Sequence, residues 1–132
     1  MIVVIDTNVW ISALQFAKRR GTPTRALERA MSEDVIATCA EIEAEIVRVL
    51  TEKFFWEAHR ATLALQTIQA RGMHVKIHGA VKVCRDPKDD MFLECAEQAE
   101  ADFLIAGDKD LLSLGAYKAT RIVTPAEYLL TR

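Results

Sequence analysis

The stretch IVVIDTN, residues 2–8, decides the fold of this chain. Its first four residues are apolar and β-branched, a pattern typical of a short strand that is buried on both faces of a parallel sheet. The next three, Asp6 to Asn8, favour turns and helix caps, and a helix is predicted over 9–16. A buried strand that leads directly into a helix indicates an α/β fold.

Strands and helices alternate along the rest of the chain. Beyond the first strand, the pattern predicts strands at 35–37, 74–77, 102–106 and 121–123, and the segment 79–83 could share the role of 74–77. It predicts helices at 9–16, 24–32, 40–53, 56–70 and 89–100, and a last helical turn from Pro125. We therefore expect a single α/β domain over residues 1–132, an α/β/α sandwich with a mainly parallel sheet of about five strands.

The composition is that of a globular protein, with 51% hydrophobic and 27% charged residues. No apolar run approaches the roughly 20 residues of a membrane helix, and Asp6 interrupts the N-terminal apolar run before it could act as a signal peptide. We therefore expect a cytoplasmic protein with no membrane partner. The three cysteines, Cys39, Cys84 and Cys95, show no CxxC spacing, which favours reduced and mostly buried thiols.

Two aspartates follow predicted strands directly. Asp6 comes after IVVI and Asp108 after FLIAG, where Gly107 is expected to let the backbone turn sharply. In a parallel α/β sheet ligands bind beyond the carboxyl ends of the strands, so both carboxylates are expected to face one crevice. Because two carboxylates in one crevice repel each other, the pair predicts a cation between them.

The helix patterns add a third carboxylate and leave a fourth open. In the helix predicted from residue 89, Asp89 falls inside the buried stripe, whereas Asp90 points away and is expected to be solvated. In the helix from residue 40, Glu43 and Glu45 flank the buried stripe on opposite sides, and periodicity does not choose between them. A purely structural interpretation also exists, since Asp6 and Asp89 both stand where a helix cap would.

The side chains expected in this crevice offer oxygen ligands only. Without a converging histidine or cysteine, such a set favours Mg²⁺ or Mn²⁺ over zinc. Several carboxylates in one cleft suit metal-assisted hydrolysis of a phosphodiester, in which the metal acidifies the attacking water and neutralises charge on the phosphate. The net charge of −2 argues against holding nucleic acid by bulk electrostatics but allows a local basic patch.

Four segments, taken in order, resemble the PIN domain, the nuclease fold of many bacterial and archaeal toxins of VapC type. They are VVIDTNVWISAL from residue 3, AEIEAEIVRVL from residue 40, DPKDDMFLECAEQAEADFLIAGDKDLLSLG from residue 86, and IVTPAEYL from residue 122. Each segment alone is weak evidence, but their order and spacing together are specific. The resemblance covers nearly the whole chain, and its third segment is most similar to the subgroup described as toxin components of PIN type.

The resemblance implies a site and an activity. It selects Glu45 over Glu43 in the second segment. The catalytic residues and metal ligands that it implies are Asp6, Glu45, Asp89 and Asp108, with Asn8 and Asp110 in support. It implies a Mg²⁺- or Mn²⁺-dependent endoribonuclease acting on RNA, usually homodimeric and often inhibited by an antitoxin encoded beside it. One departure is Ala106, where relatives often have serine or threonine, so that a hydrogen bond to the metal site would be lost.

Two further runs have alternative interpretations. The basic run Lys18-Arg19-Arg20 is either a solvated loop or a contact for RNA phosphates, because it follows the first helix and is expected near the strand-end face. The aromatic run FFW at 54–56 is expected in the core or in a dimer interface rather than under stacked bases.

Three alternative functions stay open beside the ribonuclease. A PIN domain that only binds is disfavoured by the four intact acidic residues. A phosphatase of the haloacid-dehalogenase type would need a second aspartate where the chain has Asn8. A phospho-acceptor receiver domain would need an adjacent acidic pair at the first strand end, whereas the pair Asp89-Asp90 opens a late helix.

Overall fold

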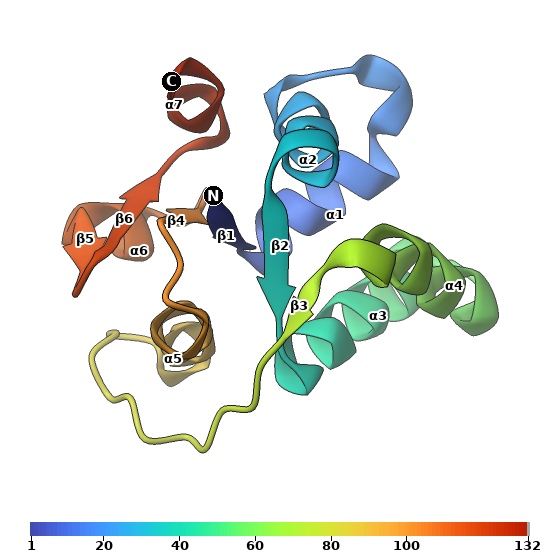
Figure 1. Cartoon of the computed structure of the whole chain (residues 1–132). Coiled ribbons are helices and arrows are strands. Elements are labelled where there is room, and N and C mark those ends of the chain that lie inside the picture. The colour runs from blue at the N-terminus through green and yellow to red at the C-terminus, as the bar shows by residue number, and fades with distance from the viewer. Residues whose placement is uncertain (132) are drawn as a thin grey trace.

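A six-stranded sheet in the order β3-β2-β1-β4-β6-β5 forms the centre of the computed structural model, which describes residues 1–131 (Figure 1). Every neighbouring pair is parallel except β5 and β6. The strands are β1 (Ile2–Ile5), β2 (Val35–Thr38), β3 (Met73–His74), β4 (Phe103–Ile105), β5 (Ala116–Tyr117) and β6 (Thr120–Val123). The mainly parallel sheet is confirmed, with six strands in place of about five.

Helices cover both sides of this sheet. The α-helices are α1 (Thr7–Gln15), α2 (Thr22–Glu33), α3 (Ala40–Phe54), α4 (Ala58–Ile68), α5 (Asp90–Ala99), α6 (Lys109–Leu114) and α7 (Pro125–Leu130). Short 3₁₀ turns are η1 (Ala17–Arg19), η2 (Gln69–Arg71) and η3 (Pro87–Asp89). In Figure 1, α2 and α7 lie on one side of the sheet and α5 lies on the other. Within residues 1–131 no helix has both the length and the apolar character to cross a membrane.

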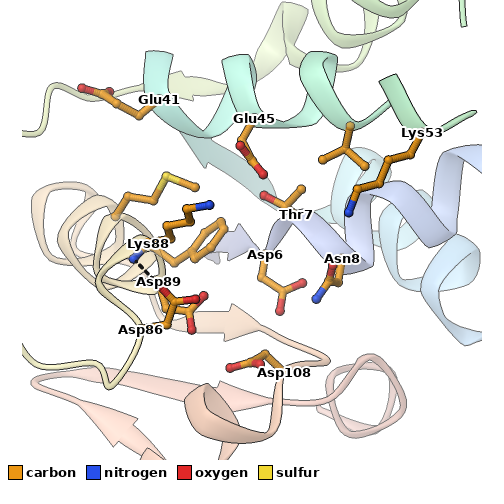
Figure 2. Close-up of a pocket in the computed structure, with 13 residues that line it drawn as sticks. Asp6, Thr7, Asn8, Glu41, Glu45, Lys53, Asp86, Lys88, Asp89 and Asp108 are labelled. Carbon is orange, nitrogen blue, oxygen red and sulfur yellow. Dashed lines mark hydrogen bonds between the residues drawn. The ribbon is translucent and has the colours of Figure 1, made fainter. Parts of the chain in front are cut away.

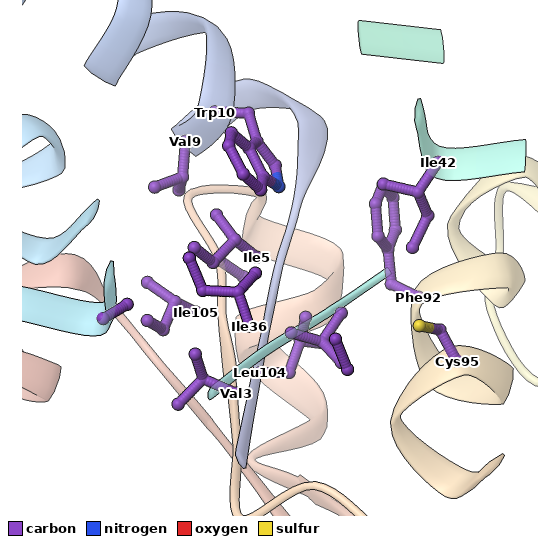
Figure 3. Packing of buried hydrophobic residues seen from close by; sticks show 14 of the residues in the cluster. Val3, Ile5, Val9, Trp10, Ile36, Ile42, Phe92, Cys95, Leu104 and Ile105 are labelled. Atoms are coloured by element: carbon purple, nitrogen blue, oxygen red, sulfur yellow. The ribbon is translucent and has the colours of Figure 1, made fainter. Parts of the chain in front are cut away.

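The core forms around β1 and β4, which lie side by side (Figure 3). Val3, Val4 and Ile5 are at most 1% exposed, as the uninterrupted apolar run predicts for a strand covered on both faces. Leu104 and Ile105 of β4 are equally buried. Burial of each such side chain contributes about 1.5–3 kcal/mol and stabilises the pairing of the two strands. Because β1 and β4 are parallel, their carboxyl ends lie at the same edge of the sheet.

The predicted third strand is wrong over most of its length. β3 is only Met73–His74, and residues 75–86 contain no strand. The carboxylate of Glu94, which is 3% exposed, accepts backbone N–H groups from this segment at His78, Ala80 and Val81. A side chain on α5 thus supplies the acceptors that a neighbouring strand would otherwise have supplied.

The prediction that Asp90 is merely solvated is also wrong. Its Oδ1 accepts the backbone N–H groups of Val83 and Cys84, with N···O distances of 3.0 and 2.7 Å. These bonds lower the pKa of the Asp90 carboxyl. Helix phase alone did not reveal this role, because the partners belong to a loop without a sequence pattern of its own.

Smaller departures lie at element ends and at the sheet edge. β5 pairs with β6 around a tight turn in which Lys118 has a φ of 53°, without the Asn-Gly or Asp-Gly signal that predicts such hairpins. The helix α6 was not predicted. α4 begins at Ala58 rather than at residue 56, because the Glu57 side chain caps its first turn. All three cysteines are free thiols, as expected.

Candidate metal and active site

A cleft of about 320 Å³ opens at the carboxyl edge of β1 and β4 (Figure 2). Its lining residues are Asp6, Thr7, Asn8, Glu41, Glu45, Val49, Lys53, Asp86, Lys88, Asp89, Met91, Phe92 and Asp108. Side chains from the β1–α1 junction, from α3, from η3 and from the β4–α6 junction therefore meet in one place. All four carboxylates expected as ligands, and Asn8, are among them.

Asp6 is the most deeply placed of these carboxylates, at 2% exposure. Its Oδ1 accepts the N–H of Val9 at 2.8 Å, which caps α1, and its Oδ2 accepts the N–H of Gly107 at 3.0 Å, which ties β1 to the end of β4. Burial raises the pKa of Asp6, the N–H groups oppose that rise, and the charge of Asp108 adds to it. Asp6 thus both caps α1 and lines the cleft.

Asp108 faces Asp6 from the end of β4. Its Oδ2 accepts the N–H of Leu111 at 3.0 Å and so caps α6. The expectation that Gly107 is needed for a sharp backbone turn is wrong. Its φ is not positive, and a Cβ at this residue would lie 3.9 Å from its nearest neighbour, Val9. Gly107 contributes through its N–H to Asp6 instead.

Asp89 ends the turn η3 and lies on the opposite side of the cleft from Asn8 (Figure 2). Burial raises its pKa to about 6, and the negative charges of Asp108, Asp86, Asp6 and Asp110 add to that rise. The cleft therefore has a surplus of negative charge that a bound cation would relieve.

Glu45 reaches the cleft from α3, whereas Glu43 does not. The Glu43 carboxylate accepts the hydroxyl of Thr38 and lies 3.2 Å from Nδ1 of His74. Glu45 binds both arms of the Arg48 guanidinium, with N···O distances of 2.7 and 3.1 Å. Arg48 lowers the pKa of Glu45, and the charges of Lys88 and Lys53 contribute to that shift.

The remaining predicted residues divide between the cleft and the surface. Asn8 lines the cleft, whereas Asp110 does not and influences Asp89 only through its charge. The basic run at 18–20 lies in and just beyond η1, at the far end of the nine-residue helix α1 and so about 14 Å from Asp6. None of the three basic residues lines the cleft, and their contact with RNA phosphates stays a prediction.

Four charged residues of the cleft were not predicted as site residues: Glu41, Lys53, Asp86 and Lys88. Glu41 is one turn before Glu45 on α3, so an i, i+4 rule applied to Glu45 would have found it. In Figure 2 the side chains of Lys53 and Lys88 extend into the cleft from different elements. Single lysines carry no sequence pattern, and only the fold brings these two together.

The donor set fits a hard divalent cation in its chemistry, since every acidic ligand offers oxygen. The hydroxyl of Thr7 also lines the cleft, is buried and has no hydrogen-bond partner among the described residues. Within residues 1–131, however, no three acidic, histidine or cysteine side chains stand close enough to hold a metal as they are. A bound cation would therefore need these side chains, the three aspartates included, to move closer together, and Glu45 would also have to exchange Arg48 for it.

Ala106 packs in the core at 0% exposure, and its N–H donates to the carbonyl of Val123 at 2.8 Å. Both oxygens of the nearby Asp6 already accept N–H groups from Val9 and Gly107. The lack of a hydroxyl at residue 106 therefore leaves neither oxygen of Asp6 without a donor.

The family model described as PIN domain matches residues 2–110. An uncharacterized protein of Methanocaldococcus jannaschii is 31% identical over 117 residues, which cover 85% of this chain and 74% of that protein.

Two solved structures are similar in fold. The structure of VapBC2 from Rickettsia felis bound to a promoter DNA fragment matches with a TM-score of 0.60 at 13% identity, covering 92% of this chain and 97% of that one. Mycobacterium tuberculosis VapC20, described as a toxin that cleaves the sarcin–ricin loop, matches with a TM-score of 0.58 at 19% identity, covering 90% and 98%. The family match spans most of this chain and contains all six acidic residues of the cleft, so the protein belongs to the PIN domain family.

Proposed function

We propose that this protein is a Mg²⁺- or Mn²⁺-dependent endoribonuclease and the toxin of a toxin–antitoxin pair. The observation that carries the proposal is the meeting of Asp6, Glu45, Asp89 and Asp108 in one cleft of a PIN domain. The similar fold of VapC20, a toxin that cleaves the sarcin–ricin loop, supports RNA as the substrate class.

In this proposal the carboxylates have unequal tasks. Asp6 and Asp108, each held by backbone N–H groups, offer ligand oxygens in fixed positions. Asp89, with its raised pKa, gains most from a cation, because the cation replaces the repulsion of its acidic neighbours. When bound, a divalent ion supplies an acidified water and neutralises charge on the phosphate.

The basic side chains complete the proposed site. Lys53 and Lys88 attract the phosphates of RNA toward a cleft that carboxylates would otherwise make repulsive. Arg48 does not line the cleft, and when Glu45 turns to the cation its guanidinium keeps the pairing with Glu52, 3.7 Å away.

The test is cleavage of total RNA by the purified protein with Mn²⁺ or with EDTA. We expect cleavage only with metal, and its loss in Asp6→Asn and Asp89→Asn variants that stay folded. Glu45→Gln and Glu43→Gln form a matched pair on α3, of which only the first should lose activity, since only Glu45 lines the cleft. Metal-dependent cleavage that persists in both aspartate variants would refute the proposal. RNA binding without any cleavage would favour the non-catalytic binding module.

We also propose a homodimer and a cognate antitoxin as partners. The R. felis structure of similar fold is a VapBC complex, which supports a bound antitoxin. Sedimentation of the purified protein tests the dimer. Co-expression with the product of an adjacent reading frame tests the antitoxin, which should suppress both growth inhibition and RNA cleavage. Growth inhibition that persists beside every adjacent product would remove the antitoxin from the proposal.

A further inference from the structure

An aromatic surface lies where α1 and α3 end side by side. We call Phe16, Phe54, Phe55 and Trp56 the aromatic edge. The rings of Phe16 and Phe54 meet edge to face, with centroids 6.3 Å apart. The indole N–H of Trp56 donates to Oε1 of Gln15 at 2.7 Å, which fixes the end of α3 against α1. Phe54 and Trp56 are half-buried and pack on the core, as expected for part of the run 54–56.

Phe55 is not in the core, because its side chain is 86% exposed, and of the two expected places only the dimer interface stays open for it. It also caps α3 in the left-handed region, with a φ of 59°, where glycine is the favoured residue. A non-glycine residue in this region is strained, and an exposed ring recovers little of that strain by burial. Among the described residues Arg20, Glu100 and Lys118 share this backbone conformation, so the exposed aromatic ring is what sets Phe55 apart.

Cations surround the aromatic edge. The guanidinium of Arg19 lies 4.5 Å from the centroid of Phe16, and that of Arg60 lies 3.9 Å from the centroid of Trp56. Within residues 1–131, neither arginine forms a salt bridge. The carboxylate of the adjacent Glu57 accepts the backbone N–H groups at the start of α4. The two guanidinium groups thus place positive charge at the rings of Phe16 and Trp56, while the nearby Glu52 is paired with Arg48.

The aromatic edge is continuous with the cleft. Lys53 lines the cleft and is two residues before Phe55 at the end of the same helix (Figure 2). An RNA strand that leaves the cleft past Lys53 would therefore pass the end of α3 that carries Phe55. A second copy of this protein is a poorer occupant, because a symmetric contact would bring the same cations face to face.

We propose that the aromatic edge binds single-stranded RNA beside the cleft, with one base stacked on Phe55 and a neighbouring phosphate on Lys53. The inference rests on the proposed ribonuclease function and adds to it the form of the substrate. Stacking on an aromatic side chain tolerates any base, so this contact gives affinity and a direction of exit rather than sequence preference.

The experiment replaces Phe55 by glycine and uses Glu100→Gly as its matched control. Glu100 caps α5 with a φ of 53°, is exposed, and lies outside the cleft lining, so both substitutions relieve the same backbone strain. Binding of a short fluorescent single-stranded RNA is measured by anisotropy in EDTA, where no metal-dependent cleavage occurs. Melting temperatures are measured in parallel.

We expect both variants to melt at higher temperature than the wild type. Phe55→Gly should weaken RNA binding about tenfold, whereas Glu100→Gly should change it less than twofold and Phe55→Trp should keep it. Unchanged affinity in Phe55→Gly, or a change in its sedimentation that shows a contact between copies, would overturn the inference. Wild-type protein that binds the RNA but does not cut it with Mn²⁺ would refute the ribonuclease proposal alone.

Discussion

The two sides of the cleft hold their carboxylates in different ways. On the sheet side, Asp6 and Asp108 accept N–H groups of the main chain, at distances of 2.8 to 3.0 Å. On the α3 side, Glu45 is held by the side chain of Arg48, which is itself 44% exposed. The sheet side is therefore preorganised by the fold, whereas the α3 side can exchange its partner.

Within residues 1–131 no three such ligands stand together, the aspartates Asp6, Asp89 and Asp108 included. In the proposed function, the strand ends hold two ligand positions before an ion arrives. Glu45 would join them only when a cation competes with the Arg48 guanidinium. Metal binding should therefore respond weakly to changes in Arg48 and strongly to changes in the sheet-side aspartates.

The largest effect should be on RNA cleavage. We expect Asp6→Asn to reduce the rate by about 1,000-fold or more, because a fixed ligand is lost and several kcal/mol of transition-state stabilisation go with it. Glu45→Gln should reduce the rate by only about 10- to 100-fold, and raised Mn²⁺ should recover part of that loss. Single-turnover cleavage across a Mn²⁺ titration measures both. Equal losses that no Mn²⁺ concentration repairs would show that the two sides do not differ.

The next effect is on the free energy of unfolding. Asp6→Ala leaves two N–H groups without their acceptor, at Val9 and Gly107, and should lower the stability by about 2 kcal/mol. Asp108→Ala removes one helix cap and should lower it by about 1 kcal/mol. Urea denaturation in EDTA compares them. A larger loss in Asp108→Ala would contradict the role of Asp6 in tying β1 to β4.

The same contrast separates what the sequence predicted from what it did not. The strand β1 and the place of Asp6 at its carboxyl end follow from seven adjacent residues, because local patterns and the geometry of a parallel sheet determine them. The segment 75–86 failed as a strand because its acceptors are the side chains of Glu94 and Asp90, which no periodicity in the segment itself reveals.

The site divides in the same manner. Periodicity left Glu43 and Glu45 equivalent, family resemblance chose Glu45, and the contacts of Glu43 with Thr38 and His74 turn it away from the cleft. Lys53 and Lys88 come from α3 and η3, and only tertiary structure brings them to one cleft. The run with Phe55 is expected in the core or in a dimer interface because aromatic side chains are ordinarily covered, and the left-handed backbone of Phe55 is not readable from the sequence.

A pH-dependent effect should distinguish Asp89 from Glu45. The folded state raises the pKa of Asp89 from 3.8 to about 6, so it favours the protonated form, and ionisation above that pH destabilises the fold. Asp89→Asn should therefore be more stable than the wild type by about 1 kcal/mol at neutral pH in EDTA, after allowance for screening by water. The gain should shrink as the pH falls below about 6 and vanish near pH 4.

Glu45→Gln is the control for this pH series, because its effect on stability should have the opposite sign to that of Asp89→Asn. The pKa of Glu45 is lowered in the folded state, so its charged form stabilises the fold above its ordinary pKa of 4.5 and this contribution is lost as the pH falls. The glutamine variant should thus be slightly less stable than the wild type at neutral pH. Denaturation curves across the pH range that show the same sign for both variants would contradict the assigned electrostatics.

The smallest effect should come from Arg48 itself. Arg48→Met frees Glu45 from its bidentate partner, and we expect the dissociation constant for Mn²⁺ to fall about threefold, as befits an exposed ion pair. Arg71→Met removes an equally basic exposed side chain that does not line the cleft, so it controls for net charge. Arg48→Lys keeps the positive charge and loses the bidentate contact with Glu45. A Mn²⁺ affinity between those of the wild type and Arg48→Met would show that the charge and the bidentate contact each contribute. Isothermal titration measures all three, and weaker Mn²⁺ binding in Arg48→Met would mean that the guanidinium positions Glu45 for the cation rather than competing with it.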